Sequence, residues 1–174
     1  GVWLPKDEQH LVDWMCHGKR AQRVDGKITY QWWKQEAAMR IADEYLPDWR
    51  DGIFVDVGAH CGLWSMWWGP QAKSVVAYEP VPEFRRIFAA NVDPNQTDYY
   101  LRRNAVSDRP GWIEIRLDPT NTGGTRAYAD GEEHDVQIVH ARTVTIDDTI
   151  FEHTSVDPVT VLKIDCEGYE EKVV

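Results

Sequence analysis

Basic residues, paired cysteines and long apolar runs are all scarce in this sequence of 174 residues. Its 19 Lys and Arg stand against 29 Asp and Glu, which gives a formal net charge of −10. Such a charge repels a phosphate backbone, so nucleic acid is not an expected partner. The three cysteines include no Cys-x-x-Cys pair, which argues against a disulfide framework and favours a reducing, cytoplasmic compartment. Without an apolar run of about 18 residues or a basic-then-apolar leader, we expect neither a membrane partner nor secretion.

Tryptophan is unusually abundant, with nine residues, and this indicates bulky packing in the core or exposed aromatic patches. The six histidines form no ligand-spaced cluster, so we predict no metal site. The length has room for one domain with a sizeable core.

The first 50 residues differ in pattern from the rest. Residues 1–26 mix proline, charge and isolated apolar positions, which predicts a short helix within an irregular arm. Residues 30–45 carry apolar side chains at three-to-four spacing, and Pro47 ends this helical pattern. We therefore predict an N-terminal helical arm and cap over residues 1–50, followed by one α/β domain over residues 51–174.

From residue 51 onward, short apolar runs alternate with helical patterns, which is typical of βαβ units and a parallel sheet. Strict alternation over 112–117 predicts an exposed antiparallel strand. The run over 159–164 is apolar enough to predict a buried strand. The full prediction is strands over 53–57, 75–79, 99–106, 112–117, 136–144 and 159–164, with helices over 63–68, 82–92 and 146–151.

The chain ends about one turn after that last strand. A buried strand normally has a neighbour on each side, so one edge of 159–164 is expected to be left open. We therefore expect a fragment that is truncated after the fourth parallel strand, or a chain completed by another polypeptide. A homo-oligomer is a further alternative.

A strand that ends in Asp56-x-Gly58-x-x-x-Gly62 and leads toward a helix predicts a tight turn whose backbone amides face a ligand. A glycine turn that only reverses the chain is the alternative. The dinucleotide fingerprint G-x-G-x-x-G is not present, whereas sites for S-adenosylmethionine (SAM) tolerate a substituted middle glycine and carry an acidic residue before the first one. NAD is therefore the weaker alternative.

Two carboxylates follow predicted strands at positions where a ligand would lie. Glu79 comes about twenty residues after the glycine turn, where a carboxylate accepts hydrogen bonds from both hydroxyls of a ribose. Asp165 follows the last predicted strand, and open α/β sheets bind ligands outside the carboxyl ends of their strands at the switch point. The alternatives are a solvated strand end for Glu79 and a helix N-cap for Asp165.

These blocks together resemble the FkbM-type methyltransferases, from about residue 30 to the C-terminus. The matching segments are Val55-Asp-Val-Gly-Ala-His-Cys-Gly62, Ala77-Tyr-Glu-Pro80, Asn104-Ala-Val-Ser-Asp108, Asn121-Thr-Gly-Gly124, Thr143-Val-Thr-Ile-Asp-Asp148 and Leu162-Lys-Ile-Asp-Cys-Glu-Gly-Tyr-Glu170. The resemblance implies a Rossmann-like class I methyltransferase fold, with helices on both faces of the sheet, that binds SAM. The cofactor-binding residues expected from it are Asp56, Gly58, Ala59, His60, Gly62, Glu79, Asn104, Ala105, Val106 and Asp165.

Their expected roles differ by block. The glycine loop would surround the methionine and ribose parts of SAM, Glu79 would hold the ribose, and the segment from Asn104 would lie near the adenine. Asp165 would lie at the mouth of the site, after a strand that flanks the strand of Asp56 in the class I methyltransferase fold, and is the candidate catalytic residue.

The predicted function is SAM-dependent O-methylation of a hydroxyl on a small molecule or sugar. A hydroxyl acceptor needs at most one base, and Asp165, Glu167 and His60 are candidates by position. His134 and His140 would reach the site only if the loop over residues 118–131 closes as a lid; a plain hairpin connection is the alternative. Two alternative hypotheses remain: a SAM-binding or partner-binding module without turnover, and an NAD-dependent oxidoreductase.

Overall fold

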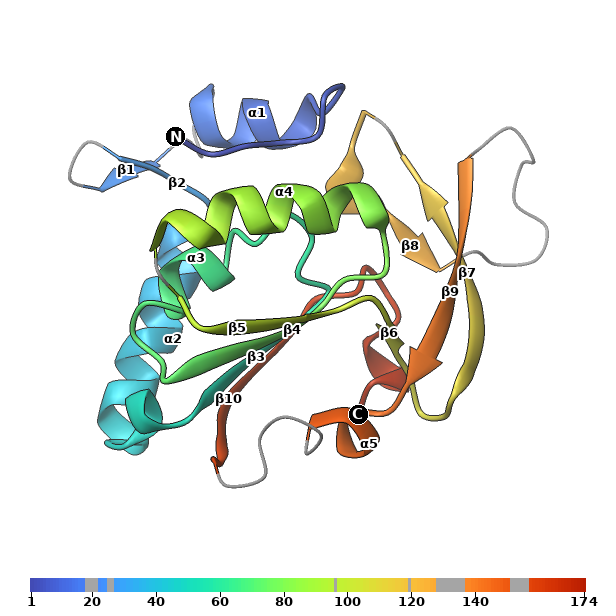
Figure 1. The fold of residues 1–174 in the computed structure, drawn as a ribbon. Helices are drawn as coiled ribbons and strands as arrows, with labels where there is room; N and C mark the ends of the chain where they lie inside the picture. Colours follow the sequence, from blue (N-terminus) through green and yellow to red (C-terminus); the bar gives the residue numbers. More distant parts are fainter. Residues whose placement is uncertain (18–21, 25–26, 96, 119, 128–136, 151–156) are drawn as a thin grey trace.

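Two four-stranded sheets and a short two-stranded ribbon form the framework of the chain (Figure 1). The structure is a computed structural model that describes residues 1–17, 22–24, 27–95, 97–118, 120–127, 137–150 and 157–174. No helix within these ranges is long and apolar enough to cross a membrane.

The first sheet is parallel throughout, as the alternation of strands and helices predicted. Its order is β10 (Val159–Ile164), β3 (Ile53–Val57), β4 (Ser74–Tyr78) and β5 (Tyr99–Arg102). Lys163 of β10 lies opposite Asp56 of β3, which confirms that the strand leading to Asp165 flanks the strand of Asp56. The chain builds β3, β4 and β5 in one direction and then returns to the other side of β3. This reversal places the switch point between β3 and β10.

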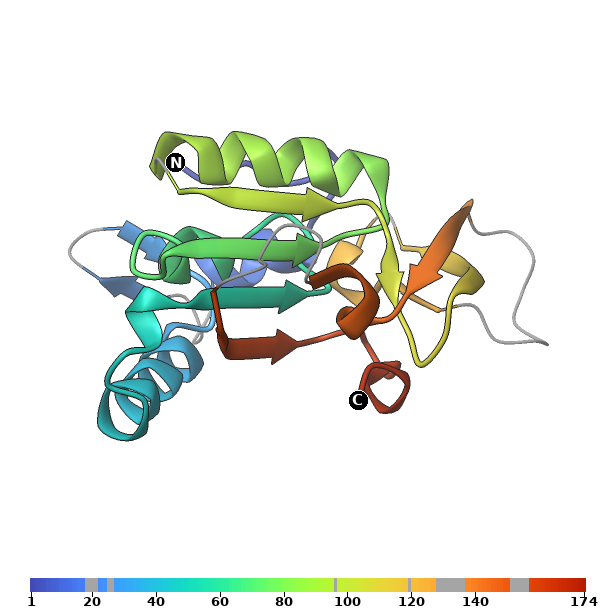
Figure 2. The same ribbon diagram turned by 60° about the horizontal axis from the view of Figure 1, so that its bottom comes forward.

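Helices cover both faces of this sheet (Figures 1 and 2). Every residue of β3 and β4 is buried, and alternate side chains point to opposite faces. One face packs against α2 (Trp32–Tyr45), α3 (Ser65–Trp68) and α4 (Pro82–Val92). The other face packs against α5 (Ile146–Ile150).

The second sheet lies beside the start of α4. Its order is β6 (Ala105–Val106), β9 (Gln137–Val144), β7 (Gly111–Leu117) and β8 (Arg126–Ala127). The antiparallel pairing of β7 with β9 confirms the prediction for that segment. Apolar side chains of β7 and β9 pack on Val81 and Phe84, so this sheet is joined to the first one through α4.

The N-terminal arm packs onto the loop after β3 and onto α4. It contains α1 (His10–Cys16), β1 (Gln22–Val24) and β2 (Lys27–Thr29). Leu11 and Met15 of α1 are buried against Cys61 and Leu63. Cys16, the last residue of α1, is exposed, and the thiols of all three cysteines are free. The predicted division at residues 50 and 51 stays a prediction.

Three-residue 3-10 turns complete the described elements. They are η1 (Trp49–Asp51), η2 (Asp93–Asn95), η3 (Thr122–Gly124) and η4 (Glu170–Lys172).

Several predicted elements need correction. The single strand expected over 99–106 is two strands in different sheets, because the chain turns out of the parallel sheet at residues 103–104. The helix expected over 63–68 begins only at Ser65. Residues 136 and 151, the predicted ends of a strand and a helix, lie outside the described ranges.

The expectation that 159–164 is fully buried is also wrong. Val159 and Leu162 are 42% and 46% exposed. Among the described strands β10 pairs with β3 alone, and it therefore forms an edge of the sheet.

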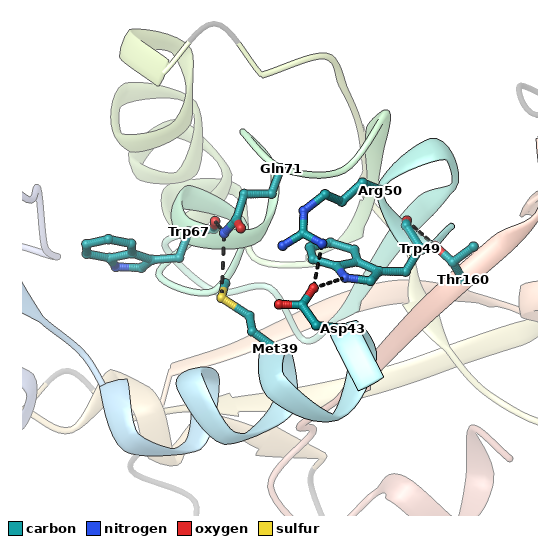
Figure 3. Close-up of polar contacts among 7 residues, drawn as sticks. All are labelled: Met39, Asp43, Trp49, Arg50, Trp67, Gln71 and Thr160. Atoms are coloured by element: carbon teal, nitrogen blue, oxygen red, sulfur yellow. Dashed lines mark hydrogen bonds and ion pairs between the residues drawn. The ribbon is translucent and has the colours of Figure 1, made fainter. Parts of the chain in front are cut away.

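Aromatic packing closes the amino end of the parallel sheet. Figure 3 shows the polar contacts of Trp49 and its neighbours there. The Trp49 ring is buried and lies 5.1 Å from the ring of Trp68. Its Nε1 donates to Asp43 Oδ1 (2.8 Å), while its carbonyl oxygen accepts from Thr160 Oγ1 (2.8 Å). Because Asp43 lies on α2 and Thr160 on β10, Trp49 joins the cap helix to the edge strand.

Gln71 makes a second connection in the same region. Its Nε2 donates to Met39 Sδ (3.5 Å) and to the carbonyl oxygen of Trp67 (2.9 Å), and it thereby links α2 to the end of α3 (Figure 3).

Candidate functional site

A cavity opens at the carboxyl ends of β3, β4 and β10, where open α/β sheets place their ligands. The second sheet and the arm supply its remaining walls. Among the predicted cofactor residues, those that line it are Gly58, Ala59, His60, Glu79, Asn104, Ala105, Val106 and Asp165. Asp56 and Gly62 do not line it.

Gly58 allows the carboxyl ends of β3 and β10 to lie close together. Its φ is +71°, and a Cβ there would lie 2.1 Å from the backbone oxygen of Asp165. The backbone amides of Gly58 and Ala59 both donate to the carbonyl oxygen of Tyr78 (3.1 Å). The loop therefore turns tightly against β4 and β10, and glycine is required at this position.

Gly62 does not line the cavity and packs against α4. Its φ is +79°, and a Cβ there would lie 2.9 Å from Phe88 and 3.0 Å from Val92 of α4. Glycine at this position lets α4 approach the loop.

Asp56 acts from beneath the cavity. It is fully buried, its Oδ2 accepts from Ser65 Oγ (2.7 Å), and its Oδ1 lies 3.0 Å from Lys163 Nζ. Lys163 also donates to the carbonyl oxygens of Gly58 (2.8 Å) and Val57 (3.2 Å). This pair fixes the carboxyl end of β3, so Asp56 shapes the glycine loop although it does not line the cavity.

Lys163 lines the cavity and was not identified from the sequence. Burial alone would lower its pKa, but the charges of Asp56 and Asp165 outweigh burial and raise it, so the ammonium group stays charged. A lone lysine within the apolar run Val161-Leu-Lys-Ile164 was the available signal, because a buried lysine needs a partner.

Glu79 is buried at the end of β4, with 4% of its surface exposed. Its Oε2 accepts from the backbone N–H of His60 (2.8 Å), and its Oε1 accepts from that of Val81 (2.8 Å). Burial raises the pKa of Glu79 to about 7, although both N–H groups favour the charged form. Each oxygen retains a lone pair for a further donor.

His60 is held on both sides of its ring. Its Nε2 lies 2.9 Å from Thr122 Oγ1, and its Nδ1 lies 3.1 Å from Cys61 Sγ. Burial, with a contribution from the charge of Lys163, lowers the pKa of His60 to about 3. A ring that is neutral and engaged at both nitrogens is a weak proton acceptor, so the structure removes His60 from the candidate bases.

The mouth of the cavity is acidic. Asp165 is exposed there, and Glu167 lines the cavity with φ at +51°. Glu170 holds this turn, since its carboxylate accepts from the backbone N–H groups of Cys166 (2.7 Å) and Gly168 (3.0 Å). Burial, and then the charge of Asp165, raise the pKa of Glu167. The N-cap alternative for Asp165 is not realised, because the next helical turn begins at Glu170.

Another wall of the cavity comes from residues 104–106, where the chain crosses between the two sheets. Several lining residues were not anticipated as site residues. The main ones are Leu11, Tyr30, Thr122 and Tyr169. Leu11 and Tyr30 belong to the arm, and no local motif connects them with the site.

His140 is the one other histidine among the candidate bases that the structure describes. His140 is exposed on β9, with its Nδ1 3.5 Å from Glu114 Oε1, and it does not line the cavity. His134 and His153 lie outside the described residues, as do residues 119 and 128–131 of the proposed lid over 118–131. Within the described ranges no group of three or more His, Cys, Asp or Glu side chains is arranged to hold a metal ion.

Comparison with protein families matches residues 56–174 to the methyltransferase FkbM domain. No curated protein matches the chain. Among solved structures, the chain is similar to the crystal structure of a candidate RNA methyltransferase from Pyrococcus horikoshii, with 18% identity and a TM-score of 0.39. That match covers 58% of this chain and 43% of the other. Because the family match spans more than half of its length, the chain belongs to the FkbM methyltransferase domain family.

Proposed function

We propose that this chain binds SAM in a Rossmann-like class I arrangement and transfers its methyl group to a hydroxyl on a small molecule or sugar. Family membership supports methyl transfer. The observation that carries the cofactor assignment is Glu79, a buried carboxylate on the cavity wall with a lone pair left on each oxygen. Such a group suits the two hydroxyls of a ribose.

The charges of the cavity suit SAM better than NAD. Glu79, Asp165 and Glu167 line it, and the charge of Lys163 is balanced by Asp56. SAM carries a sulfonium and an ammonium group against one carboxylate, whereas NAD carries a diphosphate that these carboxylates would repel. Residues 104–106 offer a largely apolar wall for an adenine.

When bound, SAM supplies an electrophilic methyl carbon; the acceptor oxygen forms a bond to that carbon as the carbon–sulfur bond breaks. The protein must align the acceptor and take the hydroxyl proton. Asp165 is the proposed proton acceptor because its carboxylate is exposed at the mouth, and Glu167 is the second candidate. Glu170 orders the turn that carries both.

Calorimetry with S-adenosylhomocysteine (SAH), the demethylated product, tests cofactor binding. Glu79→Ala is expected to lower SAH affinity at least about tenfold, on the scale of charged hydrogen bonds. Glu83→Ala is the matched control, because it removes the same charge from an exposed site on the first turn of α4. Binding of NADH without binding of SAH would overturn the proposal.

Transfer of a labelled methyl group to a panel of sugars and small hydroxyl compounds tests the reaction. Asp165→Asn is expected to reduce turnover with SAH affinity changed less. SAH binding with no transfer to any acceptor would favour the binding-module alternative, and transfer to RNA alone would contradict the proposed acceptor class.

We further propose that the parallel sheet is extended beyond β10, by more chain or by a partner. The exposed apolar side chains of Val159 and Leu162 on this edge strand support it. Light scattering would reveal association of the chain, and a monomer that stays soluble at high concentration would count against a partner at this edge.

A further inference from the structure

The N-terminal arm is bonded directly to the loop that lines the cofactor cavity. Glu8 is buried, its Oε2 accepts from the backbone N–H of Thr122 (2.5 Å), and it also accepts from the Thr122 hydroxyl. The same hydroxyl oxygen lies 2.9 Å from His60 Nε2. Three segments far apart in the sequence therefore meet in one line of hydrogen bonds.

The direction of these bonds fixes the tautomer of His60. Because Glu8 is a carboxylate, the Thr122 hydroxyl must donate its proton to it and can only accept at His60. His60 Nε2 therefore carries the proton, and Nδ1 accepts from the thiol of Cys61. This assignment follows from the network and not from observed hydrogens.

His60 is also bonded to the proposed ribose carboxylate. Its backbone N–H donates to Glu79 Oε2, and its φ of +50° is unusual for a residue other than glycine. A residue in a strained conformation keeps it only where its surroundings hold it. The bonds to Thr122 and Cys61 hold the side chain, and the bond to Glu79 holds the backbone.

A second connection runs through α4. Asn91 is buried, exchanges hydrogen bonds with the backbone of Trp3 (2.7 and 2.9 Å), and donates to the carbonyl oxygen of Cys61 (2.8 Å). The arm, which lies along α4 (Figure 1), is thus connected to His60 through Thr122 and to Cys61 through Asn91. Both attachments come from residues that precede the matched family domain at 56–174.

We propose that Glu8 and Thr122 are positioning residues for the cofactor site, which act through His60 to hold the Glu79 carboxylate in its binding orientation. The identity of the ligand in this inference rests on the proposed function, whereas the connection from Glu8 through Thr122 to His60 rests on the hydrogen bonds alone. A simpler role competes with it: Glu8 Oε1 accepts from the backbone N–H of Leu11 (2.7 Å) and so stabilises the start of α1.

Substitutions at Thr122 separate the two roles, since they leave the bond from Glu8 to Leu11 intact. Thr122→Val removes the hydroxyl between Glu8 and His60, and Thr122→Ser restores it. Thr120→Val is a matched control, because Thr120 makes an exposed hydroxyl bond to Asp118 (2.9 Å) in the same loop and does not reach His60.

For Thr122→Val we expect SAH affinity to fall about fivefold by calorimetry, the scale of one neutral hydrogen bond. Thr122→Ser and Thr120→Val are expected to stay within about twofold of the unchanged chain. Glu8→Gln, whose amide has a single acceptor oxygen, is expected to lose affinity in the same direction as Thr122→Val.

A ligand-free measurement keeps this inference distinct from the proposed function. Nitrogen-15 spectra of the imidazoles, assigned with His60→Gln, should show His60 in the Nε2–H form and a mixed tautomer in Thr122→Val. If the unchanged chain fails to bind SAH, the proposed function fails while the spectra still test the link. An unaltered His60 spectrum in Thr122→Val, or equal SAH affinity with only a lower melting temperature, would overturn the positioning role.

Discussion

The two ends of the parallel sheet differ in the side chains that pack there: aromatic rings at the amino end and charged groups at the carboxyl end. At the amino end, Trp49, Phe54 and Trp68 pack ring against ring, with Phe54 and Trp68 stacked at 5.2 Å. At the carboxyl end, the buried groups are the charged pair Asp56 and Lys163 and the carboxylate of Glu79. Aromatic burial stabilises a fold directly, whereas a buried ion pair is weak evidence for stability.

This difference indicates which end of the sheet carries the functional site. A carboxylate with a raised pKa, a strained histidine and a buried lysine gather at one end and line one cavity. Perturbed groups of this kind cluster at functional sites, while structural ends do not need them. Substitutions at the amino end should therefore change stability alone, whereas substitutions at the carboxyl end should change both stability and binding.

The largest effect is expected from Trp49→Ala. It removes a fully buried ring and leaves a cavity between α2 and the sheet, with an expected loss of about 4 kcal/mol in the free energy of unfolding. Trp33→Ala is the control, because Trp33 on α2 is 58% exposed and should change stability by less than about 0.5 kcal/mol. Urea denaturation measures both, and Trp49→Phe serves if the alanine variant does not fold. Equal losses for Trp49 and Trp33 would break the comparison.

Lys163→Met is expected to cost about 3 kcal/mol or more, because it leaves the Asp56 carboxylate buried without its partner. The double variant Asp56→Asn/Lys163→Met should recover much of that loss, since no uncompensated charge remains. A double-mutant cycle in urea gives the coupling. If the double variant is no more stable than Lys163→Met, the unpaired Asp56 carboxylate is not the cause of the lost stability.

Glu79 should make stability depend on pH. Burial raises its pKa from 4.5 to about 7, so the folded chain holds the proton more tightly than the unfolded chain. Its contribution is complete below about pH 4.5 and is lost as pH rises to about 7, an effect on the order of 3 kcal/mol. Glu79→Gln removes this titration, so the difference between the two unfolding free energies should change across that window and be flat above it. A constant difference would show that Glu79 titrates normally.

Gly58→Ala should cost about 2 kcal/mol, because its Cβ meets a backbone oxygen and its φ is positive. Gly168→Ala is the matched control: its φ is +96°, but nothing lies within 4 Å of the added Cβ. We expect about 1 kcal/mol there, from strain alone. Thermal unfolding compares the two, and a ranking opposite to this would show that the approach of β3 and β10 adjusts freely.

The smallest effect is expected at an exposed pair on the cap helix. Arg40 Nη2 lies 2.9 Å from Glu36 Oε1, and Arg40 is 77% exposed. Arg40→Ala should therefore change the free energy of unfolding by only about 0.4 kcal/mol, and high salt should remove that difference. A loss above 1 kcal/mol would mean that the outer face of α2 has a packing role.

The elements that could be predicted from the sequence are those in which apolar residues recur with a clear period. The bounds of β3 and α4 match the expected ranges 53–57 and 82–92, because both are buried on faces that the apolar pattern marks. The break at residues 103–104 could not be predicted, since a local apolar pattern does not say which sheet a strand joins. The exposure of β10 likewise depends on its neighbours and not on its composition.

The candidate site divides in the same way. Gly58 and Glu79 were predictable because each directly follows a strand whose end faces the cavity. Leu11 and Tyr30 reach the cavity through tertiary contacts between distant segments, and no spacing in the sequence reveals them. Thr122 lies in the matching segment Asn121-Thr-Gly-Gly124, but that segment does not reveal its contact with His60. Asp56 and Gly62 show the opposite case, in which a motif residue supports the site from behind.

The three cysteines differ in a way that provides a chemical handle on the arm. The Cys61 thiol is buried and its pKa is raised by burial, and burial raises the pKa of Cys166 to about 12. Because the thiolate is the reactive species, both should react slowly with alkylating reagents near neutral pH. Cys16, exposed at the end of α1, is then the first to be labelled. A fluorophore attached there, without any engineered residue, would report a change in the environment of the arm if ligand binding in the cavity causes one.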